Sequence, residues 1–228
     1  LENNNNTFIG FSSGGGTWEV NGSDSNTGVG SNTMIGAMND ANYNTAMGHN
    51  ALSALTLGDN NTAIGYNALT SGTSATENTI VGSLAGDALV GGGSNTIVGA
   101  HAGGQTTAVG KTVIIGAEAG ESVMEATADG TVAVGYEALK GLTSGAGSVA
   151  VGYRALKAQT TGASNTAIGY QSMLVANHAD ADQNTCVGYI SGNAISSGQK
   201  NTLIGNEAGC TRLTTGDKNT AVGAETLG

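Results

Sequence analysis

The stretch Asn61-Thr62-Ala63-Ile64-Gly65 returns 17 residues later as Asn78-Thr79-Ile80-Val81-Gly82, and after another 17 as Asn95-Thr96-Ile97-Val98-Gly99. Self-similarity at a fixed period is typical of repeat architectures. The glycine that closes each copy can be followed along the whole chain at intervals of 17 to 20 residues. These glycines are Gly10, Gly30, Gly48, Gly65, Gly82, Gly99, Gly116, Gly135, Gly152, Gly169, Gly188, Gly205 and Gly223. The sequence therefore predicts 13 copies, with two partial copies ending at Gly36 and Gly110 that do not shift the period.

The residue before the closing glycine is Ile or Val in every copy except at Met47. Stiff β-branched residues at one fixed position favour a strand, and a segment of four or five residues is too short for a stable helix. A second apolar element follows the glycine, as at 67–69, and predicts a second short strand in each coil. The remainder of a copy is Ser, Thr and Gly, typical of turns. We therefore expect an all-β fold: one parallel β-solenoid domain over 1–228, with about 13 coils of 17–20 residues and insertions at 11–25, 120–130 and 174–183.

Many copies place apolar residues at both of the last two positions before the glycine, as at 80–81 and 97–98. Since neighbouring residues of a strand point to opposite faces, this pattern predicts that both faces are buried. One face can pack inside its own coil, whereas the other needs a partner surface. We expect a homo-oligomer about a common axis, with three chains the natural arrangement and two left open. The asparagine that starts most copies should form a stacked amide ladder.

Composition excludes several function classes. The 228 residues include 39 Gly and no Pro, and the formal net charge is −10, with no Lys or Arg before Lys111. We therefore expect neither nucleic-acid binding nor membrane insertion, because no basic patch and no long apolar stretch is present. Cys186 and Cys210 fit no zinc spacing, and no cofactor is expected. The first residues, which lack a Met and a signal-like segment, read as a fragment or processed product.

The segment Asn-Thr-Ala-Ile-Gly-Tyr-Asn-Ala-Leu at 61–69, repeated in part at 165–170, is similar to repeats of bacteriophage tail fibres. Its core motif followed by Tyr-x-Ala resembles the head repeats of YadA-like trimeric autotransporter adhesins. The resemblance implies a left-handed parallel β-roll in a homotrimer, intertwined or side by side. It also implies a structural and adhesive, non-catalytic role in attachment to a host surface, through a glycan or an outer-membrane component. A virion tail fibre is favoured because the repeat is longer than that of the adhesin heads, and a bacterial surface adhesin of the YadA type is the alternative.

Aromatic residues provide candidate receptor contacts. Tyrosines follow the closing glycine in successive late coils and should form a column that either holds sugar rings or packs turns. The tyrosines of this predicted column are Tyr136, Tyr153, Tyr170 and Tyr189, with Tyr66 as an earlier member. Trp18 lies in the glycine-rich first insertion and is a candidate for receptor contact or for capping the end of the solenoid.

Other residues carry weaker signals. His178, Asp180 and Asp182 resemble a cation site, but no calcium-loop pattern supports it, so a solvated loop is the simpler interpretation. His49 and His101 are expected to be solvent-facing turn residues. Cys186 is expected to be a small buried hydrophobe.

Two further functions deserve comparison. Hexapeptide-repeat acyltransferases need an aliphatic-glycine pair every six residues, and only the intervals 30–36 and 110–116 show this spacing, so an enzyme is not expected. Ice binding is suggested by a recurrent threonine that begins the strand, as at Thr62, Thr79 and Thr96. By strand alternation this threonine shares a face with the Ile/Val position, which indicates the interior and disfavours ice binding.

Overall fold

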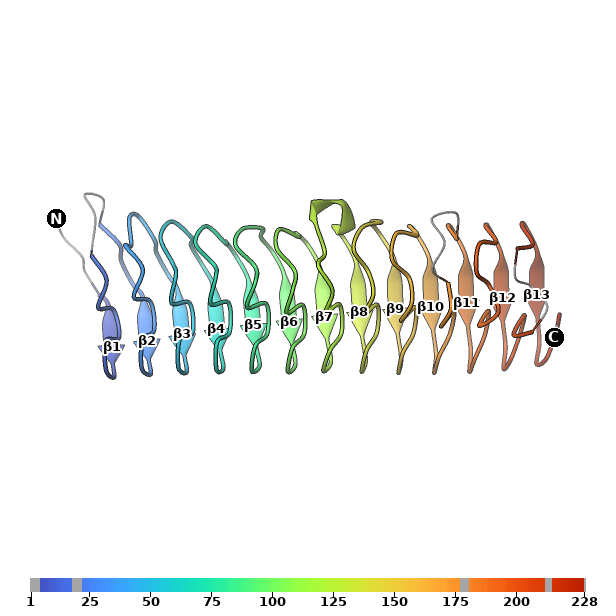
Figure 1. The fold of residues 1–228 in the computed structure, drawn as a ribbon, viewed down its shortest axis with the longest axis horizontal. Coiled ribbons are helices and arrows are strands. Elements are labelled where there is room, and N and C mark those ends of the chain that lie inside the picture. Colours follow the sequence, from blue (N-terminus) through green and yellow to red (C-terminus); the bar gives the residue numbers. More distant parts are fainter. Residues whose placement is uncertain (1–4, 18–21, 177–180, 212–214, 228) are drawn as a thin grey trace.

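The computed structural model describes residues 5–17, 22–176, 181–211 and 215–227, which form a straight rod of stacked coils (Figure 1). Each coil contributes a three-residue strand to one 13-stranded parallel sheet, in which every strand pairs with the next one in the sequence. The strands are β1 Thr7–Ile9, β2 Thr27–Val29, β3 Thr45–Met47, β4 Thr62–Ile64, β5 Thr79–Val81, β6 Thr96–Val98, β7 Val113–Ile115, β8 Val132–Val134, β9 Val149–Val151, β10 Thr166–Ile168, β11 Thr185–Val187, β12 Thr202–Ile204 and β13 Thr220–Val222. At the usual spacing between strands of about 4.8 Å, the rod is on the order of 60 Å long. The predicted β-solenoid and its period are confirmed.

The prediction of two strands per coil is wrong. Within the described residues each coil has one strand, and the segment after the closing glycine is a series of turns. A single isolated bridge, Thr76 to Gly93, and a 3-10 helix at Ala126–Ala128 complete the regular structure of the described part. This short helix lies in the predicted 120–130 insertion and projects from the side of the rod opposite the tight turns (Figure 1). The partial copies around Gly36 and Gly110 form no strand, in agreement with their expected place inside a coil.

The middle residue of every strand points into the coil, and its size is matched to the residue six positions later. Coils with alanine at the strand carry a large residue there, as in Ala63 with Leu69. Coils with a large strand residue carry glycine instead, as in Ile80 with Gly86. A Cβ on Gly86 would come within 2.9 Å of Ile80 Cδ1, so the two large side chains cannot occupy one coil. The core therefore has room for one large residue at this level of each coil.

The closing glycines are required by both conformation and space. Gly135 has φ +132°, and a Cβ there would lie 2.5 Å from the carbonyl oxygen of Gly152 in the next coil. The same close approach recurs from coil to coil, because each closing glycine meets the next. Only glycine permits this turn while the coils keep the sheet spacing.

The predicted amide ladder is confirmed. Asn95 donates its backbone N–H and its side-chain Nδ2 to Oδ1 of Asn78, at 3.1 and 2.8 Å, and Nδ2 also donates to the carbonyl of Val109. Asn78 makes the equivalent pair of bonds to Asn61. The ladder is interrupted in the middle of the rod, where Thr112 donates its hydroxyl to Asn95. The buried amides thus satisfy turn carbonyls, as expected.

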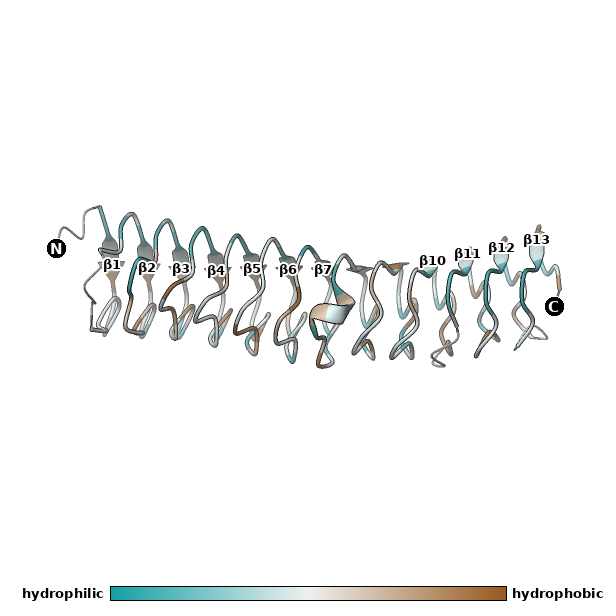
Figure 2. Cartoon of the chain, turned by 90° about the horizontal axis from the view of Figure 1, so that it is seen from above, coloured by the Kyte–Doolittle hydropathy of each residue, from teal (hydrophilic) through white to brown (hydrophobic). Residues whose placement is uncertain are grey.

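The threonine and the Ile/Val residue of each strand share a face, as predicted, but their expected interior position is wrong. Residues of the middle column, such as Ala63, are fully buried, whereas Thr62 and Ile64 are half-buried on the outside of the coil. Viewed from above, the strands line one side of the rod, and the turns and the 3-10 helix lie on the other (Figure 2). The coil is narrow, so the middle residue of each strand is enough to fill the strand side of the interior. The Ile/Val column is therefore left outside.

Candidate functional site

The outer sheet face consists of the first and third residues of the 13 strands. Its first column contains only Thr or Val, and its third column contains only Ile, Val or Met. Ile168 and Ile204, in the interior of the array, are each 40% exposed, and the two terminal members of the column are more exposed still. No charged residue belongs to either column. The outer sheet face is thus an uncharged and periodic surface, with an aliphatic column beside a mainly threonine column, that runs the length of the rod.

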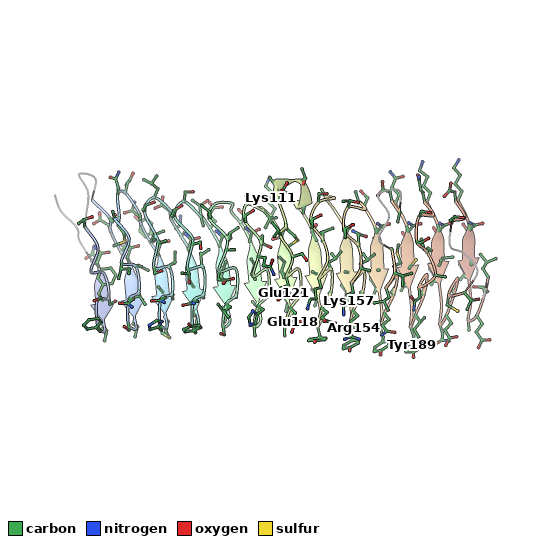
Figure 3. All side chains as sticks on the ribbon, in the orientation of Figure 1. Lys111, Glu118, Glu121, Arg154, Lys157 and Tyr189 are labelled. Carbon is green, nitrogen blue, oxygen red and sulfur yellow. The ribbon has the colours of Figure 1, made fainter. Side chains whose placement is uncertain are left out.

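The predicted tyrosine column is present. The rings of Tyr136, Tyr153, Tyr170 and Tyr189 are stacked, with centroids 5.1 to 5.5 Å apart and interplanar angles of 7 to 21°. Each tyrosine is between 36 and 48% exposed. Tyr189 is labelled at the lower edge of the rod, where the chain turns after each strand (Figure 3). Because each inner ring covers the faces of its neighbours, the column offers ring edges and hydroxyl groups to solvent, rather than open ring faces.

The coil does not require an aromatic residue at this position. Ser83, Ala100 and Ala117 occupy it in three consecutive coils that fold in the same way. No hydrogen bond from a hydroxyl of the four column tyrosines to another described residue is present. Tyr66 does not join the column, contrary to the prediction: it stacks on His49, with centroids 5.7 Å apart, earlier on the same edge. The tyrosine column is therefore an exposed feature added to the fold, not a packing requirement of its turns.

An ion-pair network beside the tyrosine column was not anticipated from the sequence. Glu137 accepts hydrogen bonds from Arg154 Nε at 2.5 Å and from Lys157 Nζ at 2.8 Å. Lys140 links Glu137 to Glu118 and Glu121 at 3.4, 2.5 and 2.9 Å respectively. These side chains come from three successive coils, and Figure 3 labels four of them, Glu118, Glu121, Arg154 and Lys157, in the lower half of the rod. The signal was readable, because Arg154 follows Glu137 at the repeat distance of 17 residues.

The network changes the ionisation of its members. Burial raises the pKa of Glu137, but the hydrogen bonds and charges of Lys157 and Arg154 outweigh burial and lower its pKa to about 2. Hydrogen bonds to Glu118 and Glu121 raise the pKa of Lys140. The Arg154 guanidinium also lies over the Tyr153 ring, 4.9 Å from its centroid, and so joins the network to the tyrosine column.

The remaining candidates give no evidence of a chemical site. Trp18, His178 and Asp180 lie outside the described residues. Asp182 accepts a hydrogen bond from the backbone N–H of Ala163 at 2.7 Å and so holds two coils together. Within the described ranges there is no cluster of three potential metal ligands and no enclosed pocket.

Two minor predictions can be compared with the structure. His49 and His101 are exposed, as expected. Cys186 is fully buried, and burial raises the pKa of its thiol to about 12. In the described part of the chain, no helix is long and apolar enough to span a membrane.

No protein-family model, curated protein or solved structure matches this chain. The surfaces described above and the repeat motif are therefore the features that bear on function.

Proposed function

We propose that this chain is a rigid structural and adhesive segment of a trimeric viral tail fibre. The observation that carries the proposal is the outer sheet face, an uncharged stripe of Ile, Val and Thr along the whole rod. Parallel sheets are normally covered on both faces, and a long exposed apolar surface is typical of a protein interface. The likeness of the repeat motif to tail-fibre repeats supports the same assignment, with a left-handed β-roll as the expected protomer. A bacterial surface adhesin head is the related alternative.

A second and a third copy of the same chain are the best partners for this face. A partner must match a surface that repeats at the strand spacing over about 60 Å, and another solenoid of the same period does so. The chain has a net charge of −10, so association is favoured through a surface that carries no charge, such as the outer sheet face. Three outer sheet faces packed around a common axis would exclude water from all three Ile/Val columns.

Attachment would use the surfaces that stay outside this interface. The tyrosine column lies along the edge of the rod rather than on the outer sheet face, so it remains available in such an assembly. We expect it to contact a host-surface glycan or outer-membrane component without catalysis, and three chains would present three columns together.

The interface can be tested by placing charges on the outer sheet face. The variant V81D/V98D introduces two carboxylates into the Ile/Val column, and the matched control S83D/A100D introduces two on the exposed edge a few residues away. We expect a monomer for the first variant and an unchanged oligomer for the control by light scattering, with circular dichroism to show that both are folded. A folded V81D/V98D variant with an unchanged mass would refute the proposed interface.

Ice binding is the second candidate, because the threonine column lies on the outside of the coil and not in the interior, where it was expected. Ten of the 13 strands begin with Thr, and the column lies beside the Ile/Val column on one continuous face. A regular row of hydroxyl and methyl groups can order water. Thermal hysteresis by a monomer would favour this candidate over the fibre, and a trimer without thermal hysteresis would exclude it.

A further inference from the structure

We infer that the tyrosine column is a binding site for an extended, uncharged polysaccharide chain that lies parallel to the rod, with one sugar ring to each coil. The inference deepens the proposed function, because it names the class and the shape of the host-surface ligand. It rests on the proposed attachment role but not on the number of chains in the assembly.

The column is a row of like groups at a constant pitch. The centroids of successive rings are 5.5, 5.1 and 5.3 Å apart, and the two inner rings, Tyr153 and Tyr170, are each stacked between two neighbours. A ring stacked on both faces has little room to change rotamer. The row is therefore preorganised, and little conformational entropy is lost when a ligand binds.

The groups that the row exposes suit a carbohydrate. Each tyrosine presents an apolar ring edge and a hydroxyl that bonds no other described residue, and a phenol hydroxyl both donates and accepts. Sugar rings carry apolar C–H groups on their faces and hydroxyls along their edges, so an aromatic C–H edge beside a hydroxyl can contact both.

The row also discriminates by shape. Because the inner ring faces are covered by other rings, single sugars cannot stack flat on them. A linear chain that advances by about one coil spacing per ring can instead bring one sugar ring to each tyrosine. A coiled polysaccharide diverges from the straight row after one or two contacts. Affinity should therefore rise with the number of rings in an extended chain.

Charge at the site favours a neutral ligand. The adjacent carboxylate of Glu137 is paired with Arg154 and Lys157, so the positive groups nearest the column are already compensated. An acidic polysaccharide would also meet the net negative charge of the chain.

The experiment is calorimetric titration of the full chain with cellohexaose, which is extended, and with maltohexaose, which is coiled. We expect binding of cellohexaose, weaker binding of cellotriose and at least tenfold weaker binding of maltohexaose. In Y153A/Y170A we expect at least a tenfold loss of cellohexaose affinity, and alanine at these positions is compatible with the fold because it occurs there in Ala100 and Ala117. The matched control Y66A, on the same edge but outside the column, should bind as the unmodified chain does.

Two results would overturn the inference: no binding of cellohexaose by the unmodified chain, or equal affinity in Y153A/Y170A. Equal affinity for the two hexasaccharides would overturn the proposed alignment. The mass of the same sample keeps this test separate from the fibre proposal. A trimer that fails to bind contradicts only the site, and a monomer that binds contradicts only the assembly.

Discussion

At the scale of single residues, the backbone conformation that each position requires determines which residues recur in the repeat. Each coil places a glycine of large positive φ after the strand and further positive-φ residues within its turns, as in Asn67 at 53° and Leu69 at 50°. Proline fixes φ near −65° and therefore fits none of these positions, which agrees with its absence from the chain. The sequence alone located every closing glycine, but the contact that excludes a side chain there lies between coils and became visible only in the structure.

The closing glycines provide the first prediction. We expect G135A to destabilise the rod by about 2–4 kcal/mol, because its Cβ would combine positive-φ strain with overlap on the carbonyl of Gly152. The matched control is G223A, where φ is +130° but the nearest atom to a Cβ is Thr226 Cγ2 at 3.3 Å. Urea unfolding should show a clearly larger loss for G135A. Equal losses would mean that conformation alone, and not the contact between coils, requires glycine.

At the scale of the coil, stability depends on complementary side-chain volumes: a small residue in the strand is paired with a large residue in the facing turn, and a large one with glycine. Coils with Ala133 or Ala150 in the strand carry Leu139 or Leu156, whereas the coil with Leu203 carries Gly209. The sequence shows that this position is either Leu or Gly, but it gives no sign that the choice depends on the strand residue, and the position was assigned to a second strand. Their pairing depends on which side chains face each other inside the coil, which the strand period does not reveal for an irregular turn.

This exchange provides the second prediction. We expect I80A to cost about 2–5 kcal/mol through the cavity that it leaves, and I80A/G86L to recover most of the loss by filling that space from the other side of the coil. Leucine is tolerated at φ near +50°, as Leu69 shows. The control I80A/G103L places the leucine one coil away, against an intact Ile97, and should not recover stability in denaturant unfolding. Rescue by both double variants would argue against the pairing.

The ion-pair network provides the third prediction. The pKa of Glu137 lies below its ordinary value, at about 2 instead of 4.5, so the stability that it contributes is present above pH 4.5 and is lost as the pH falls towards 2. We expect E137Q to be less stable than the unmodified chain at neutral pH, by roughly 1–2 kcal/mol after solvent screening of its partly exposed partners. The difference should shrink on acidification. A difference in unfolding free energy that stays constant between pH 7 and pH 2.5 would show that the carboxylate charge is not its source.

At the scale of the molecule, the sequence predicted much of the architecture. It did not predict which strand residues point into the coil and which point to solvent. The closing glycines gave the number of coils, and the asparagine column gave the amide ladder. The face of Thr62 and Ile64 was misassigned, because alternation shows which residues lie together but not which side of a narrow coil they occupy. The tyrosine column was predicted, whereas its covered ring faces and the adjacent network of Glu137 depend on three-dimensional contacts between coils.

The central claim is that the outer sheet face is buried between copies of the chain, and the absolute mass in solution tests it most directly. Light scattering on the untagged chain should give three times its mass of 22.3 kDa, with no dissociation on moderate dilution because the buried columns extend along the whole rod. A folded species at 22.3 kDa over the same concentrations would contradict the account, since the Ile/Val column would then face water in the native protein.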